Sequence, residues 1–140
     1  MTDETPSVAL TAATKVYGSA DAEVRALDDV TIAFPRGQFT AVMGPSGSGK
    51  STLLNCMAGL DRLTSGTVEI GGVDLRDLSD RDLTILRRTR LGFIFQSFNL
   101  LPALTARENI TYPLDLSRSR VDPQWFDELI GVLGLRDRLD

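Results

Sequence analysis

The sequence predicts an α/β fold with an antiparallel β portion at its N-terminus. Apolar residues fall mostly on alternate positions in residues 8–16, and more loosely in residues 24–34, as in strands with one buried face. An apolar run at residues 39–43 then leads directly into a glycine-rich loop and a helical segment. This order of strand, loop and helix is typical of α/β domains, so we expect residues 39–43 to form a buried strand.

The elements that follow are expected from helix terminators, helix N-cap residues and short apolar segments in the sequence. A helix is expected over residues 50–57, because Gly59 provides a stop just after it. Residues 66–70 and 91–95 have the apolar content of further strands. Between them, residues 79–88 are expected to form a helix whose N-cap is the serine at the first of these positions.

A last helix is expected near the end of the chain. Asp122 is suited to be its N-cap, Pro123 fits the first helical position, and Gly134 terminates it. The spacing of the apolar residues predicts that one face of this helix is buried, formed by Phe126, Leu129, Ile130 and Leu133.

The charge balance and the cysteine content restrict the partners and the compartment. The 140 residues include 15 Lys and Arg against 19 Asp and Glu, so this net charge of −4 offers no positive field for a nucleic acid. The single cysteine, Cys56, cannot form an internal disulfide, and the acidic N-terminus lacks the apolar segment of a signal peptide. Apolar runs are far shorter than the roughly 20 residues that a membrane span needs. We therefore expect a cytoplasmic protein that reaches the membrane only through a partner, and no nucleic acid.

The strongest motif is the glycine-rich loop, which matches G-x-x-x-x-G-K-[ST] between a predicted strand and a predicted helix. Glycines let successive backbone N–H groups converge on a polyphosphate, and the helix N-terminus adds a favourable dipole. A Gly/Ser hairpin with a solvated lysine is the alternative, and it would not require this order of elements. The residues expected to bind ATP are Gly44, Pro45, Ser46, Gly47, Ser48, Gly49, Lys50, Ser51 and Thr52.

Three side chains of this loop have distinct expected roles. Lys50, one of only two lysines in the chain, is expected to contact the β- and γ-phosphates. Ser51 has the short hydroxyl that can ligate Mg²⁺, a cation that prefers oxygen ligands. Thr52 is expected to donate to a nearer phosphate.

The loop alone names a ligand and no biological role, so the flanking segments must decide between P-loop families. These segments are Val24-Arg25-Ala26-Leu27-Asp28, Gly59-Leu60-Asp61, Thr64-Ser65-Gly66, Gly92-Phe93-Ile94-Phe95-Gln96, Phe98-Asn99-Leu100-Leu101-Pro102 and Leu104-Thr105-Ala106-Arg107-Glu108-Asn109. Together with the loop they resemble the ATP-binding subunits of ABC transporters, in the group that serves macrolide export and lipoprotein release. The resemblance implies a P-loop NTPase fold of ABC type, in which residues 1–95 hold the strands and the loop, and residues 96–140 begin the helical subdomain.

Two residues outside the loop receive roles from this resemblance. Tyr17 matches the family's aromatic residue that stacks on adenine, although a tyrosine at a strand end is more often a packing or turn residue. Gln96 matches the Q-loop glutamine, whose carbonyl oxygen reaches Mg²⁺ or the attacking water; the alternative is a solvated loop residue.

The resemblance also implies partners. A membrane-spanning permease subunit would hold the chain at the inner face of the cell membrane, and a second ATP-binding subunit would complete a dimer around two ATP molecules. Large apolar residues follow the Q-loop, and they could receive the permease or complete the core of the helical subdomain: Phe98, Leu100, Leu101 and Leu104.

Hydrolysis in this family needs four elements that the sequence lacks: a Walker B strand ending in Asp-Glu, the signature motif, a D-loop and a switch histidine. The chain contains no histidine, and its best apolar run ending in aspartate, residues 57–61, belongs to the helix after the loop. We therefore expect an N-terminal fragment of a transport ATPase. The alternatives are a nucleotide-binding module without turnover and a nontransport ABC ATPase, which the acidic charge balance disfavours.

Overall fold

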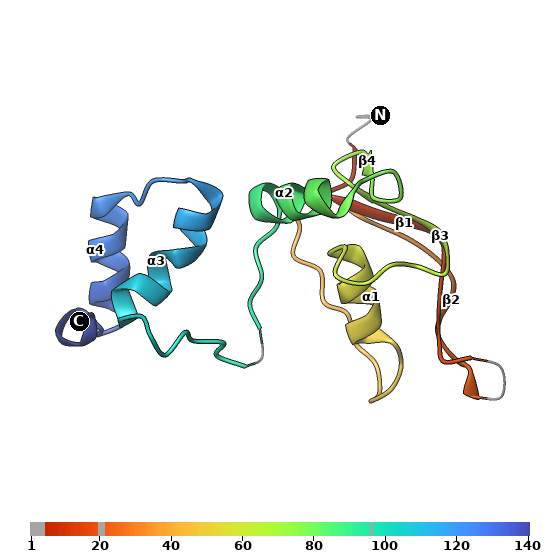
Figure 1. Cartoon of the computed structure of the whole chain (residues 1–140), viewed down its shortest axis with the longest axis horizontal. Coiled ribbons are helices and arrows are strands. Elements are labelled where there is room, and N and C mark those ends of the chain that lie inside the picture. Colours follow the sequence, from red (N-terminus) through yellow and green to blue (C-terminus); the bar gives the residue numbers. More distant parts are fainter. Residues whose placement is uncertain (1–4, 20–21, 96) are drawn as a thin grey trace. The chain divides into compact units, whose positions relative to one another are not determined.

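The computed structural model describes residues 5–19, 22–95 and 97–140. The chain divides into two compact units, Met1–Arg87 and Arg88–Asp140 (Figure 1). The first unit contains the sheet and the glycine-rich loop, and the second contains the two C-terminal α-helices.

The first unit is built on a four-stranded antiparallel sheet, which confirms the predicted antiparallel β portion. Its strands are β1 (Val8–Tyr17), β2 (Val24–Phe34), β3 (Ser65–Ile70) and β4 (Val73–Asp74), in the spatial order β2-β1-β3-β4. The first three were predicted within one or two residues, whereas β4 was not. The turn between β3 and β4 uses Gly71 and Gly72, both with positive φ, as tight hairpins require.

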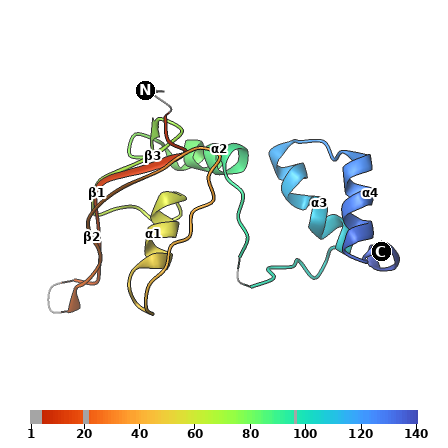
Figure 2. The same ribbon diagram turned by 180° about the vertical axis from the view of Figure 1, so that it is seen from behind.

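The core of this unit lies between the sheet and α1 (Lys50–Met57), which packs against β1, β2 and β3 (Figures 1 and 2). Burial of apolar side chains on facing surfaces is the main favourable contribution to such packing. Cys56 is 1% exposed, in agreement with a packing role in the helix. The other buried side chains of the sheet and helix are Leu10, Ala13, Leu27, Leu53, Val68 and Ile70.

Two predicted strands, residues 39–43 and 91–95, are wrong: neither segment has strand structure. Phe39 is 99% exposed, and Met43 and Ile94 are also strongly exposed. The physical reason is that a buried parallel strand is stabilised by hydrogen bonds to neighbouring strands and by layers on both faces. The pairings of the described sheet involve only β1 to β4, so apolar content alone does not make these segments strands.

The helix predicted at residues 79–88 is present as α2 (Asp80–Arg90). The hydroxyl of Ser79 accepts a hydrogen bond from the backbone N–H of Asp82 at 3.2 Å, and it donates to the Asp82 carboxylate at 2.6 Å. Ser79 therefore caps this helix, as its position in the sequence indicated.

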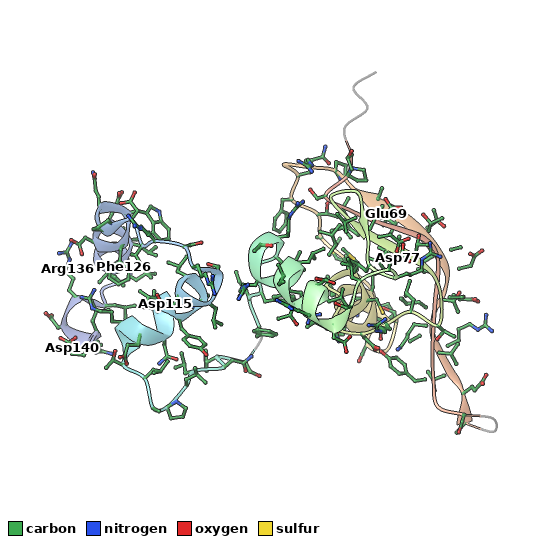
Figure 3. All side chains as sticks on the ribbon, turned by 45° about the horizontal axis from the view of Figure 1, so that its top comes forward. Glu69, Asp77, Asp115, Phe126, Arg136 and Asp140 are labelled. Atoms are coloured by element: carbon green, nitrogen blue, oxygen red, sulfur yellow. The ribbon has the colours of Figure 1, made fainter. Side chains whose placement is uncertain are left out.

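The second unit is formed by α3 (Ala106–Ser117), α4 (Pro123–Val132) and the short 3-10 helix η2 (Arg136–Arg138). Its buried core is Phe126, Ile130 and Leu139, and Phe126 points from α4 toward α3, where the guanidinium of Arg107 lies over its ring (Figure 3). Asp122 caps α4 as predicted, with its Oδ1 accepting from two backbone N–H groups at 3.0 and 3.1 Å. Leu133, predicted to be buried, is instead mostly exposed.

The sequence analysis did not predict α3. Its N-terminus carries a reciprocal capping box, in which Glu108 N–H donates to Thr105 Oγ1 at 3.2 Å and Thr105 N–H donates to Glu108 Oε2 at 2.8 Å. This Thr-x-x-Glu spacing is the signal that could have located the helix. Pro113 lies inside the helix.

Candidate nucleotide-binding site

The glycine-rich loop ends at the N-terminus of α1, and its last glycine is required by geometry. Gly49 is the N-cap residue, with φ +85°, and a Cβ atom there would lie 2.3 Å from the carbonyl oxygen of Ala26. No side chain caps the N-terminus of α1, and no acidic residue lies in its first turn. The first N–H groups of the helix and the helix dipole are therefore available to an anion.

The side chain of Lys50 is hydrogen-bonded to the glycine-rich loop that precedes α1. Its ammonium donates to the backbone carbonyls of Gly44 at 2.9 Å and Pro45 at 2.6 Å, and to the hydroxyl of Ser48 at 3.5 Å. Carbonyl oxygens carry only partial negative charge, whereas phosphate oxygens form stronger, charge-assisted bonds with an ammonium. The side chain is thus held close to the loop and can exchange carbonyl partners for phosphate oxygens.

A cavity of about 380 Å³ brings the loop together with the end of β1. Tyr17, predicted to stack on adenine, lies 39% exposed at the wall of this cavity. Arg25, at its wall on β2, was not assigned a role from the sequence. The described residues that line it are Tyr17, Val24, Arg25, Ala26, Ser46, Gly47, Gly49, Lys50, Ser51 and Thr52.

Not every predicted site residue lines this cavity. Gly44, Pro45 and Ser48 contact the Lys50 ammonium instead. Gln96, predicted to reach Mg²⁺, lies outside the described residues. The structure thus brings Tyr17 together with most of the loop.

Tyr17 is held by two residues that the sequence analysis did not connect with it. Its hydroxyl donates to Asp61 Oδ2 at 2.7 Å, and the ammonium of Lys15 lies 4.8 Å from the centroid of its ring. Lys15 also donates to Asp61 Oδ1 at 2.5 Å. The hydrogen bond from Lys15 holds the pKa of Asp61 below its usual value, and the hydrogen bond to Asp61 raises the pKa values of both Lys15 and Tyr17.

The chemistry of the donors fits a nucleoside triphosphate with a divalent cation. The cavity combines the N-terminus of a helix, an ammonium and the hydroxyl groups of Ser46, Ser51 and Thr52 with an aromatic residue at its wall. Backbone N–H groups and an ammonium suit phosphate oxygens, a serine hydroxyl suits Mg²⁺, and a tyrosine ring suits a flat base.

A loop of this pattern between the sheet and α1 defines the chain as a P-loop NTPase domain. Comparison with known proteins identifies the family: the sequence model of the ABC transporter family matches residues 27–140. The chain therefore belongs to the ABC transporter family and covers the N-terminal portion of its ATP-binding domain. The fold class expected from the resemblance is confirmed.

Several relatives are similar along most of the chain. The macrolide export ATP-binding/permease protein MacB of Hyphomonas neptunium is 43% identical over 139 residues, which are 96% of this chain and 21% of that protein. The uncharacterized ABC transporter ATP-binding protein MJ0796 of Methanocaldococcus jannaschii is 48% identical over 101 residues, covering 72% of this chain and 43% of that protein. The methionine import ATP-binding protein MetN of Photorhabdus laumondii is 43% identical over 129 residues, covering 90% of this chain and 37% of that protein.

A solved structure has the same fold. The dimeric structure of a post-hydrolysis state of the ATP-binding cassette MJ0796, bound to ADP and Pi, matches with a TM-score of 0.75 and 43% identity, covering 84% of this chain and 51% of that chain. The chain thus spans about half the length of this cassette, or less of the longer relatives. No helix in the part of the chain that the structure describes has the length and apolar character of a membrane span.

Proposed function

We propose that this chain binds ATP, with its phosphates on the loop and the N-terminus of α1 and its adenine against Tyr17. The observation that carries the proposal is the single cavity whose wall includes both the ring of Tyr17 and the start of α1. Phosphate and base are two chemically different parts of one ligand, and the lining of this cavity includes residues suited to each. The structure of the MJ0796 cassette with ADP and Pi supports the same ligand class.

Mg²⁺ is part of this proposal. Ser51, in the first turn of α1, would hold the cation through its hydroxyl, and Gln96 would join it by resemblance to the family. Bound there, Mg²⁺ would neutralise charge on the phosphates.

In the complete protein we propose that this ATP-binding domain drives transport of the export or lipoprotein-release type. The similarity to MacB over 96% of the chain supports export, while MetN, named as an import protein, is equally identical over a shorter stretch. A permease subunit and a second ATP-binding subunit are the proposed partners, and the dimeric MJ0796 cassette supports the second. The expected place is the cytoplasmic face of the membrane. A neighbouring coding region for a multi-span permease would support transport, and its absence would favour a nontransport ABC ATPase.

Lys50 provides the direct test of ATP binding. Replacing it with alanine removes a charge-assisted hydrogen bond worth about 1.5–3 kcal/mol, so Lys50→Ala is expected to raise the dissociation constant for ATP by roughly tenfold or more. Titration with a fluorescent ATP analogue measures the change. Arg36→Ala is the control, because Arg36 lies outside the loop cavity and contacts the backbone of Thr5. Unchanged affinity in Lys50→Ala would contradict the phosphate-loop assignment.

A further inference from the structure

We propose that Asp61 and Lys15 are positioning residues for Tyr17, and that they fix its ring in the orientation that receives the nucleotide base. The inference rests on the proposed function, because it takes Tyr17 to be the surface on which the base stacks. Neither Asp61 nor Lys15 lines the loop cavity, whereas Tyr17 does. Any effect of the two residues on a bound nucleotide must therefore pass through Tyr17 or through the fold.

The carboxylate of Asp61 holds the tip of the Tyr17 side chain. One oxygen, Oδ2, accepts from the Tyr17 hydroxyl at 2.7 Å, while the other, Oδ1, accepts from the Lys15 ammonium at 2.5 Å. Lys15 also donates to the backbone carbonyl of Arg62 at 2.7 Å. These bonds join Tyr17 and Lys15 of strand β1 to Asp61 in the segment that follows α1. The carboxylate cannot rotate without breaking one of its two bonds.

Lys15 also fixes which face of the ring is available. Its ammonium lies 4.8 Å from the ring centroid, within the range of a cation–π interaction. A base can then stack only on the opposite face of Tyr17. A ring held at its tip and along one face loses little further freedom when a base binds, so the binding affinity is reduced less by ordering.

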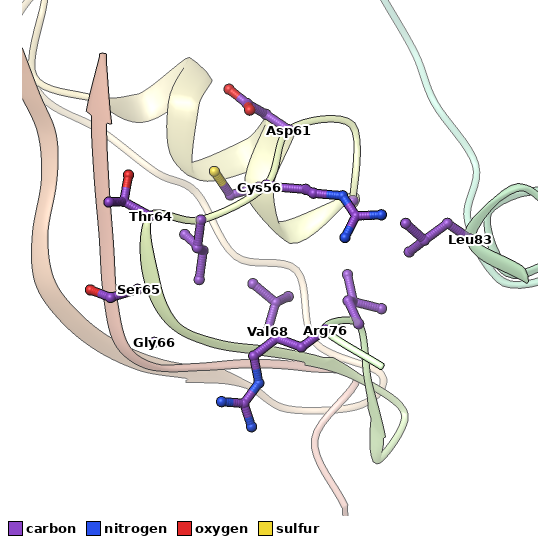
Figure 4. Close-up of a pocket in the computed structure, with 12 residues that line it drawn as sticks. Cys56, Asp61, Thr64, Ser65, Gly66, Val68, Arg76 and Leu83 are labelled. Atoms are coloured by element: carbon purple, nitrogen blue, oxygen red, sulfur yellow. The ribbon is translucent and has the colours of Figure 1, made fainter. Parts of the chain in front are cut away.

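Surface ion pairs generally contribute little to the stability of the fold, so stability alone does not account for this pair. The Lys15 side chain is 13% exposed, the least of any basic side chain in the ion pairs of the described residues. Asp61 belongs to the rim of a second cavity of about 310 Å³, but its carboxylate points away from the apolar side chains of Val68 and Leu83 there (Figure 4). The carboxylate is therefore directed to β1 and Tyr17.

The test compares two ligands that differ in having a base. The 140-residue chain and its variants are titrated with ATP and with inorganic tripolyphosphate, which engages the loop but has nothing to stack on Tyr17. Asp61→Ala and Lys15→Met are each expected to weaken ATP binding roughly three- to tenfold and to leave tripolyphosphate binding unchanged. Asp74→Ala is the matched control, because Asp74 is similarly exposed (24% against 30%) and is also ion-paired, to Arg76. It is expected to change neither affinity.

A second arm tests whether the effect passes through the ring. In a Tyr17→Ala background, Asp61→Ala is expected to cause no additional loss of ATP affinity, because residues that act through one group are not additive. Equal losses of affinity for ATP and tripolyphosphate would show that Asp61 and Lys15 support only the fold. That result would overturn the proposal. The same holds if Tyr17→Ala weakens ATP binding while Asp61→Ala and Lys15→Met do not. If Tyr17→Ala itself leaves ATP affinity unchanged, base stacking on Tyr17 is wrong, and this inference is wrong with it.

Discussion

Among single residues, Tyr17 has a ring and a hydroxyl with separable roles. Base–aromatic stacking is worth about 1–3 kcal/mol per base, so Tyr17→Ala is expected to weaken ATP binding roughly 5- to 100-fold. Tyr17→Phe keeps the ring and the Lys15 contact but loses the hydroxyl and its hydrogen bonds with Asp61 and Thr52, so its loss is expected to be smaller. Equilibrium titration with ATP measures both. Equal losses would assign the role to the hydroxyl, and no loss in either would return Tyr17 to packing.

The ion pair between Lys15 and Asp61 gives the stability of the first unit a defined dependence on pH. Folding lowers the pKa of Asp61 from its usual 3.8, so the stabilisation is present above that value and is lost as pH falls through the lowered pKa. Folding raises the pKa of Lys15 from its usual 10.5, so the stabilisation is present below 10.5 and is lost as pH rises through the raised pKa.

Urea unfolding of the chain and of Asp61→Asn across pH tests this expectation. The difference in their free energies of unfolding is expected to be constant between about pH 5 and pH 10 and to shrink on either side. A difference that grows as the solution becomes acidic would contradict it. Asp74→Asn, which breaks the pair with Arg76, separates this effect from a general response to losing a carboxylate.

The site residues that the sequence could predict are those whose spacing is local. The phosphate loop is a continuous pattern whose glycines, lysine and hydroxyls are fixed by a few neighbouring positions, and the structure brings most of it to one cavity. The contacts of Asp61 with Lys15 and Tyr17 join residues 46 and 44 positions apart. No periodicity or motif reports such a pairing, since it depends on how β1 and the segment after α1 pack.

At the scale of elements, the N-terminus of α3 offers a quantitative test. Replacing an N-cap threonine with alanine typically costs about 1 kcal/mol, and Thr105 takes part in both bonds of its capping box. Thr105→Ala is therefore expected to lower the free energy of unfolding of the second unit by about that amount. Thr105→Ser, which keeps the hydroxyl, is expected to lower it far less. Urea unfolding followed by circular dichroism measures both, and equal stability of all three chains would contradict the assignment.

Two helices with local capping residues were predicted correctly from the sequence, whereas two segments whose structure depends on distant strands were not. Helices α2 and α4 have serine and aspartate caps that act within one turn, so their sequence alone was sufficient. Residues 39–43 and 91–95 have the composition of strands, but strand structure requires a partner strand that no described segment provides. Helix α3 was missed although Thr105 and Glu108 have the spacing of a capping box, because that spacing was not used as a helix signal.

For the whole molecule, large apolar side chains are exposed in both units. The chain spans about half of the MJ0796 cassette and 21% of MacB. Phe39, Phe98 and Ile94 are almost fully exposed, and contiguous exposed apolar surface is unusual in a monomeric globular domain. Phe98, Leu100 and Leu101 are exposed and Leu104 is half-buried, and none of the four belongs to the buried core described for the second unit.

The chain of 140 residues holds only part of the groups that ATP hydrolysis requires. Phosphoryl transfer to water needs an oriented nucleophile and charge stabilisation around the γ-phosphate. Lys50 and Ser51 supply part of the second, with Gln96 by resemblance, but the sequence contains no histidine and no Asp-Glu pair after a strand. The chain is therefore expected to bind ATP without turnover above background. A longer chain that continues through the family's C-terminal half is expected to hydrolyse ATP.

Phosphate release with Mg²⁺ distinguishes these outcomes, after circular dichroism has shown that the chain is folded. Lys50→Ala is the control, because it removes the chain's own activity and leaves any contaminating ATPase in place. Background release from both chains would agree with binding alone. Robust release that depends on Lys50 would mean that another carboxylate completes the site. Asp61 and Asp115, each of which follows an apolar residue in the sequence, would then be the first to replace.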